Sequence, residues 1–186
     1  MEKTEKDKRY QKSKNAIEEA IHKLYEAGKN LSQITVSEIT NLANITRKTF
    51  YLHYQNVNDF LTEQAIESAD GYAKAYLNPS MPLISATQDL FKGITKSYFS
   101  NSFLWLLQKS KYHQAVFYDR ITLNLKNHIR LYSTLNDYAL EFISGGLTST
   151  FQLWLRSLKG GKYQPEYDNQ IKTMVEQAFS FIDNYK

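Results

Sequence analysis

At its most informative point the chain reads Asn44-Ile45-Thr46-Arg47-Lys48-Thr49-Phe50-Tyr51-Leu52-His53-Tyr54. Thr46 is suited to cap a short helix over residues 47–53, because a threonine hydroxyl accepts hydrogen bonds from the first free amides of a helix. Asn44 suits a tight turn before that helix, since asparagine tolerates a positive φ better than most residues. The segment therefore predicts a turn followed by a short, basic, aromatic helix.

Three further helices are predicted around this segment. Residues 8–27 carry apolar side chains at the spacing of one buried helical stripe. Thr35 and Glu38 have the spacing of a capping box, which predicts a second short helix that ends near residue 43 and turns Ile39 and Leu42 inward. Asn56 is suited to cap a longer helix that continues to residue 76. A short helix, a tight turn and a second short helix are typical of a helix-turn-helix, whose second helix enters the major groove of DNA.

The outward side of the second short helix carries the chemistry for reading DNA. Ile45, Phe50 and Leu52 are expected to pack onto the preceding helices. Arginine and lysine bond guanine edges, threonine reaches base edges, and hydroxyl groups suit phosphate oxygens. The predicted DNA-binding residues are Thr35, Thr46, Arg47, Lys48, Thr49, Tyr51, His53 and Tyr54. A solvated surface helix with anchored rings is the alternative interpretation, because charge clusters are usually solvated faces.

The lysine-rich N-terminus is a further candidate for following the DNA backbone. Its basic residues are Lys3, Lys6, Lys8, Arg9, Lys12 and Lys14. Glu2, Glu5 and Asp7 dilute this charge. A frayed, solvated terminus is the alternative interpretation.

Residues 8–62 resemble the DNA-binding domain of the TetR family of bacterial regulators. The resemblance lies in Thr35-Val36-Ser37-Glu38-Ile39, in Leu42 to Tyr54, and in Asn58-Asp59-Phe60-Leu61. Two positions depart from the family pattern. The usual glycine of the turn is Asn44, and the basic residue common at the start of the next helix is Val57, which removes one expected phosphate contact. The resemblance implies a DNA-binding transcriptional regulator, usually a repressor, that binds a palindromic operator as a homodimer.

The second half of the chain predicts a helical body that dimerises. Phe142-Ile143-Ser144-Gly145-Gly146-Leu147 followed by Trp154-Leu155 resembles a C-terminal domain found in TetR-like regulators of Gram-positive bacteria. By this resemblance, residues 135–158 and 167–185 are the two helices of the dimer interface. The expected interface residues are Phe142, Gly145, Gly146, Thr150, Trp154, Met174 and Ala178. Each glycine costs roughly 1 kcal/mol in a helix relative to alanine, which favours close approach of another helix; a local kink or packing inside one subunit is the alternative.

Residues 98–132 are rich in aromatic side chains, which suits a pocket for a small organic effector. The candidates for lining it are Tyr98, Trp105, Tyr112 and Phe117. An ordinary aromatic core is the alternative interpretation and fits most of these residues.

Composition excludes several function classes. The chain has 186 residues, a formal net charge of +4 and no cysteine, so disulfides and thiolate metal sites are excluded. The four histidines lack metal-ligand spacing, and no phosphate-binding loop or nucleophile motif occurs, so we expect no metal, no cofactor and no enzyme. No apolar run approaches the ~20 residues of a membrane span, and the charged N-terminus does not resemble a signal peptide. We therefore expect a cytoplasmic protein without membrane contact.

Two hypotheses follow. The first is an all-α regulator with a three-helix, helix-turn-helix DNA-binding domain in residues 1–60 and a helical-bundle dimerisation and ligand domain in residues 61–186. Its partners are double-stranded operator DNA, a second copy of the chain and a small-molecule effector. The second hypothesis is an interaction protein or co-regulator that keeps the helix-turn-helix as scaffold and binds a partner protein through its helical body.

Overall fold

The computed structural model describes residues 2–100, 109–158 and 161–183, with side chains between residues 8 and 180 of these ranges. Every regular element in the described ranges is a helix, as the sequence predicted. The elements are α1 (Glu2–Glu26), a 3-10 turn η1 (Leu31–Gln33), α2 (Val36–Leu42), α3 (Arg47–His53), α4 (Val57–Tyr76), α5 (Leu83–Phe99), α7 (Lys111–Arg130), α8 (Asp137–Ser157) and α9 (Glu166–Asp183).

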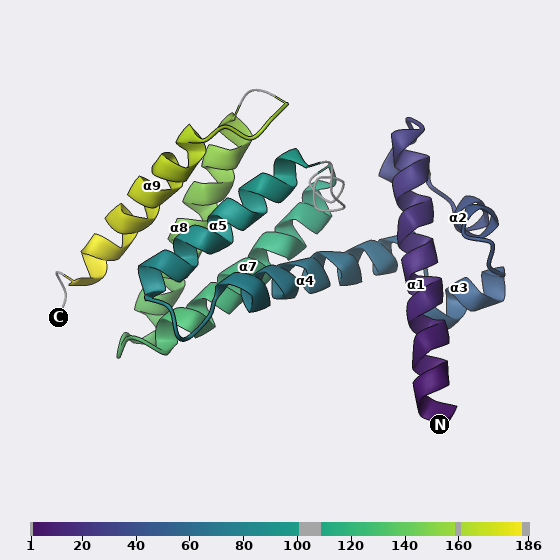
Figure 1. Cartoon of the computed structure of the whole chain (residues 1–186), viewed down its shortest axis with the longest axis horizontal. Coiled ribbons are helices and arrows are strands. Elements are labelled where there is room, and N and C mark those ends of the chain that lie inside the picture. The colour runs from purple at the N-terminus through teal and green to yellow at the C-terminus, as the bar shows by residue number, and fades with distance from the viewer. Residues whose placement is uncertain (1, 101–108, 159–160, 184–186) are drawn as a thin grey trace.

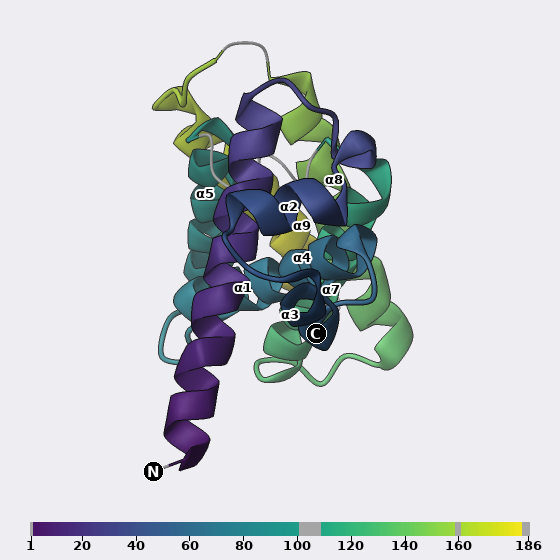
Figure 2. The same cartoon turned by 90° about the vertical axis from the view of Figure 1, so that its right-hand side faces the viewer.

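The helices form two groups joined by α4 (Figure 1). We call α1, η1, α2 and α3 the headpiece, and α4, α5, α7, α8 and α9 the body. In the headpiece α1 packs on α2 and α3, while in the body α4 packs on α5 and α7, α8 on α7, and α9 on α5 and α8. Viewed from the headpiece end, α2 and α3 lie on the outer side, away from the body (Figure 2). The second short helix is thus carried at the far end of the molecule.

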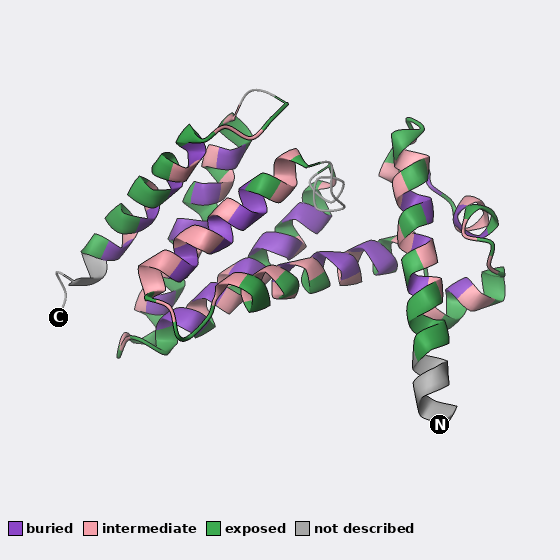
Figure 3. Ribbon diagram, viewed as in Figure 1, coloured by how far each residue is buried: buried purple, intermediate pink, exposed green. Residues whose placement is uncertain are grey.

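Buried residues follow the faces along which the helices meet, and the outer faces stay exposed (Figure 3). In the headpiece, Ile17, Ile39 and Phe50 are fully buried. In the body, Phe91 of α5 stacks on Phe151 of α8, with ring centroids 4.1 Å apart. Each such aromatic side chain buries a large apolar area, so these faces supply most of the driving force for packing.

Polar contacts also fix α4 against the body. Arg120 of α7 donates two hydrogen bonds to Asp70 of α4, at 2.6 and 2.8 Å, and Asn124 donates a third at 2.8 Å. This ion pair holds the pKa of Asp70 below its usual value. Further along α4, the ring of Tyr76 occupies the space that a Cβ at Gly93 would need. Glycine therefore lets α4 and α5 approach closely at that point.

The structure corrects two predicted facings and one predicted start. Leu42 and Leu52 were expected to face inward, yet both are exposed, Leu52 by 74%. The α1 helix begins at Glu2 rather than near residue 8. The division proposed between residues 60 and 61 falls about one turn inside α4, which continues without a break to Tyr76. That division stays a prediction.

Candidate DNA-binding surface and subunit interface

The first helix of the motif, α2, is fixed at its N-terminus by the predicted capping box. The amide of Glu38 donates to Thr35 Oγ1, and the amide of Thr35 donates to Glu38 Oε2 at 3.1 Å. Lys29 also forms an ion pair with Glu38. The hydrogen bonds from Lys29 and Thr35 lower the pKa of Glu38 to about 2. Thr35 stays exposed beside this cap, where a phosphate oxygen can reach it.

The turn and the start of α3 also match the sequence prediction. Asn44 has φ 52°, which makes it the one non-glycine residue with positive φ in the described ranges. Thr46 caps α3, because its hydroxyl accepts from the amide of Thr49 at 3.0 Å. Both features are set by local sequence, which explains why they could be predicted.

The α3 helix buries one ring and exposes its basic residues. Phe50 is 0% exposed, whereas Arg47, Lys48 and Tyr51 are exposed. Thr46 is exposed and Thr49 is half-buried. Arg47, Lys48 and Tyr51 are thus open to a partner molecule, as a helix that reads DNA would require.

Two of the predicted DNA-binding residues contact neighbouring helices. Tyr54 is only 2% exposed, and its hydroxyl donates to Glu63 Oε1 of α4 at 3.3 Å. Its ring is therefore not accessible to DNA in this arrangement, because α1 and α4 cover this end of α3, which no local pattern reveals. His53 is half-buried against α1, where its Nε2 lies 2.8 Å from Ser13 Oγ. Its assignment to DNA binding stays a prediction.

Lys14 is a further correction, because it does not belong to a cationic arm. It is buried, and its ammonium bonds Glu63 at 2.8 Å and Glu67 at 2.6 Å. Lys8, Arg9 and Lys12 remain exposed on the same helix.

Two exposed amides beside α3 are not among the predicted DNA-binding residues. Asn41 and Asn44 line a small hollow together with Thr46 and Thr49, between the end of α2 and the start of α3. Asparagine side chains bond adenine edges and phosphates. Their place on either side of the turn was the available signal.

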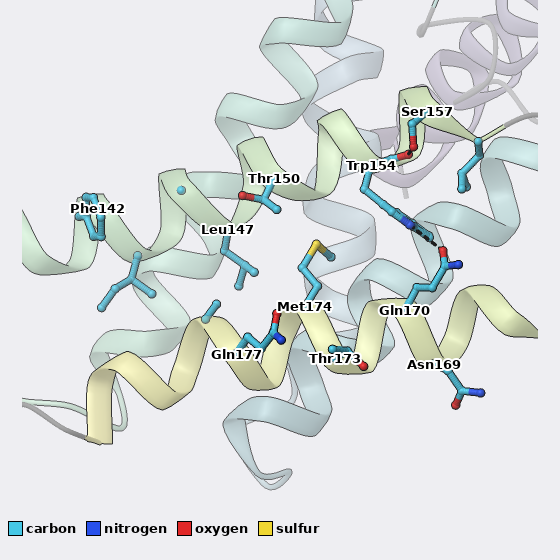
Figure 4. Close-up of a pocket in the computed structure, with 14 residues that line it drawn as sticks. Phe142, Leu147, Thr150, Trp154, Ser157, Asn169, Gln170, Thr173, Met174 and Gln177 are labelled. Carbon is cyan, nitrogen blue, oxygen red and sulfur yellow. Dashed lines mark hydrogen bonds between the residues drawn. The ribbon is translucent and has the colours of Figure 1, made fainter.

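The predicted interface residues gather in a groove between α8 and α9 (Figure 4). The groove has a volume of about 1020 Å³. Six of the seven predicted residues line it, namely Phe142, Gly146, Thr150, Trp154, Met174 and Ala178. Gly145, the seventh, is half-buried and lies outside the lining. Phe142 is 81% exposed, which is unusual for so large an apolar ring.

The two glycines of α8 have open space where a side chain would stand. A Cβ at Gly145 or Gly146 would meet no atom of the chain within 4 Å. Packing inside one subunit therefore does not explain these glycines. Trp154 is held across the groove by a 2.8 Å hydrogen bond from Nε1 to Gln170 Oε1 (Figure 4). Gln170 belongs to a polar row on α9, with Asn169, Thr173 and Gln177, that sequence analysis missed.

Known structures share this arrangement. A TetR transcriptional regulator from Streptococcus agalactiae superposes with a TM-score of 0.63 at 23% identity, covering 92% of this chain and 98% of the other. The TetR family repressor AlkX from Dietzia sp. gives 0.62 at 14% identity, covering 92% and 96%. The TetR family repressor FadR from Thermus thermophilus, solved with lauroyl-CoA, gives 0.54 at 18% identity, covering 90% and 91%. The chain has the TetR fold. No model of a protein family matches the sequence, and no curated protein matches it.

Three of the four candidate pocket residues belong to the described part of the chain. Phe117 is buried in the core, where Tyr72 meets its ring edge to face, and Tyr98 packs on Phe99. Tyr112 is 56% exposed on α7. Trp105 lies outside the described residues. The assignment of these residues to a ligand pocket stays a prediction.

Metal ligands do not cluster in the part of the chain whose side chains are described. No group of three or more His, Asp or Glu residues suited to a metal ion occurs there, between residues 8 and 180. None of the described helices is long and apolar enough to cross a membrane.

Proposed function

We propose that this protein is a DNA-binding transcriptional regulator of the TetR family that acts as a homodimer on a palindromic operator. The observation that carries the proposal is the outer face of α3. Arg47, Lys48 and Tyr51 are exposed there, while Phe50 on the opposite face anchors the helix in the core. Fixed backbone geometry with free basic side chains is what major-groove readout requires.

The homodimer is supported by the α8–α9 groove. Apolar side chains such as Phe142 and Trp154 line it, and Gly146 leaves room for a facing helix. A two-fold interface buries the same patch on both subunits, so one groove of this kind serves both partners. A dimer also presents two recognition helices, and two half-sites lie about 34 Å apart, or a multiple of that, along one face of a duplex.

A small-molecule effector and repression are the finer parts of the proposal. FadR of Thermus thermophilus binds lauroyl-CoA, and AlkX is a repressor. An effector that prefers a subunit arrangement with a different helix spacing releases DNA to the extent of its differential affinity. Such a regulator functions in the cytoplasm.

The proposal is tested with fluorescence anisotropy of the full chain on DNA from upstream of its own coding region. A random duplex of equal length serves as the comparison. We expect tighter binding to the upstream DNA, with an affinity that falls steeply as salt rises, because phosphate contacts release counterions. Equal affinity for both duplexes contradicts the proposal and favours the alternative, a protein-binding role for the helical body.

A further inference from the structure

One network of side chains connects α1, the end of α3 and α4. The ring of His53 lies against Tyr10 of α1, with centroids 4.1 Å apart, and stacks beside Tyr54, with centroids 5.8 Å apart. Its Nε2 is 2.8 Å from Ser13 Oγ. His53 is the last residue of α3, so this contact determines how the recognition helix ends against α1.

The surroundings of the two ring nitrogens favour one tautomer of His53. Ser13 Oγ reaches the carbonyls of Tyr10 at 2.9 Å and of Arg9 at 3.0 Å, so it can donate its single hydrogen there and accept one from Nε2. Nδ1 is buried and has no hydrogen-bond partner among the described residues. A proton on Nδ1 would be a buried donor without an acceptor, so a neutral ring with its proton on Nε2 fits this arrangement best.

The network continues from α3 into α4 through Glu63. Tyr54, which follows His53, donates its hydroxyl to Glu63, and Lys14 of α1 bonds Glu63 and Glu67. Burial would lower the pKa of the Lys14 ammonium, but its hydrogen bonds to the two carboxylates outweigh burial and raise that pKa. Lys14 stays charged and holds two carboxylates of α4 that would otherwise repel each other.

A proton added to His53 does not fit this arrangement. The new Nδ1–H would be a buried donor without an acceptor, and such groups are costly. Burial lowers the pKa of His53, Glu63 opposes this change, and the Lys14 charge adds to it. The net direction is downward, so the docked ring resists protonation and undocking favours it.

We propose that the network centred on His53 and Glu63 fixes the angle between the recognition helix and α4, and that protonation of His53 loosens this joint and weakens operator binding. His53 and Glu63 are positioning residues that act through α3. The inference rests on the proposed function, because it concerns how that same helix is presented to DNA.

Simple electrostatics predicts the opposite effect of pH on DNA binding. An additional positive charge at the end of α3 strengthens attraction to phosphates, so acid should tighten binding. The joint predicts looser specific binding in acid. The direction of the pH effect therefore separates the two accounts.

The test measures the ratio of affinities for the upstream duplex and the random duplex between about pH 8 and about pH 5.5, the range in which histidine titrates. For the wild type we expect this ratio to fall in acid, because the undocked ring binds a proton more tightly than the docked ring and acid therefore favours undocking. His53→Gln replaces the Nε2 donor with an amide that does not titrate, so its ratio should stay nearly flat. His22→Gln on α1 is the matched control and should follow the wild type.

Failure of the proposed function and failure of this inference give different results. No preference for upstream DNA at pH 8 contradicts the proposed function, before any acid is added. The proposal is overturned if the wild type and His53→Gln lose specificity in parallel as the pH falls. It is also overturned if the affinity ratio of the wild type rises in acid.

A measurement on the wild type without DNA decides the case in which His53→Gln fails to fold. Nitrogen-15 spectra should show His53 as the Nε2–H tautomer at about pH 8, and its titration should move the backbone amide signals of Tyr54 and Glu63 with one common midpoint. An Nδ1–H tautomer, or amides that ignore the titration, overturns the proposal.

Discussion

The outer face of α3 and the groove between α8 and α9 are both exposed, but for different physical reasons. Arg47 and Lys48 are charged, so exposure leaves them hydrated at no cost. Phe142 is apolar, so its exposure leaves a favourable burial unrealised. Exposed charge is compatible with a lone protein, whereas an exposed apolar groove is typical of a surface that another molecule covers. In the proposed function, DNA covers the first surface and a second copy of the chain covers the second.

The largest expected effect is a loss of stability on truncation of Phe50, which lies behind the charged face of α3. Phe50→Ala should lower the free energy of unfolding by about 3–5 kcal/mol, because it empties a fully buried site. Leu52→Ala on the same helix is the control and should change it by no more than about 0.5 kcal/mol, since Leu52 is exposed. Urea unfolding measures both. Equal losses would mean that the facing of α3 is wrong.

A larger residue in the groove between α8 and α9 should weaken dimerisation. Gly146→Leu places a side chain where a facing helix is expected, and overpacking costs roughly 1–3 kcal/mol, felt twice at a two-fold interface. Sedimentation should therefore show a dimer dissociation constant raised at least about tenfold.

Gly71→Leu is the matched control for this change. Gly71 is also an exposed glycine in a helix, and a Cβ there also meets nothing within 4 Å, but it lies on α4, outside the groove lining. It should gain up to roughly 1 kcal/mol of helix stability and dimerise as the wild type does. A Gly146→Leu variant that behaves like Gly71→Leu removes the argument for this interface.

Changes on the charged face should leave stability unchanged. Arg47→Ala should cost roughly 1–3 kcal/mol of specific DNA binding if Arg47 reads a base, and Lys48→Ala should weaken all duplexes alike and reduce the salt slope by about one if Lys48 holds a phosphate. Lys74→Ala, an exposed lysine in the last turn of α4, is the control. Loss of folding in Arg47→Ala would contradict the surface position of Arg47.

The smallest expected effect is a loss of stability in weak acid. Burial lowers the pKa of His113 and of His128 from the ordinary 6.5. In weak acid the unfolded chain therefore binds protons that the folded chain does not bind. The free energy of unfolding is at its full value above about pH 6.5 and falls as the pH drops below it, by at most about 1.4 kcal/mol per pH unit for each histidine. Urea unfolding between about pH 7.5 and about pH 5.5 measures this. Unfolding free energies that rise in acid would contradict the neutral, buried state of these rings.

The two surfaces also differ in how much of them the sequence could predict. Thr35, Asn44 and Thr46 act within a few residues of themselves, so caps and turn were predicted correctly. The burial of Tyr54 and the contact of His53 with Ser13 were not predicted, because they depend on α1 and α4, which are distant in sequence. Local patterns carry no information on such contacts.

The residues around the groove were singled out for a different reason, as a subunit interface that stays a prediction. Resemblance located the two helices, and the cost of glycine in a helix drew attention to Gly146, but the polar row around Gln170 on α9 has no local signature. The shape of the groove depends on how α8 and α9 pack, which the pattern of neither helix contains.

The most direct test of the account is a hydroxyl-radical footprint of the wild-type protein on the DNA upstream of its coding region. The account predicts two protected half-sites related by a two-fold axis, with centres about 34 Å apart or a multiple of that spacing, and protection that disappears with Gly146→Leu. A single protected half-site, or protection that survives in a monomeric variant, would contradict the claim that two recognition helices act together.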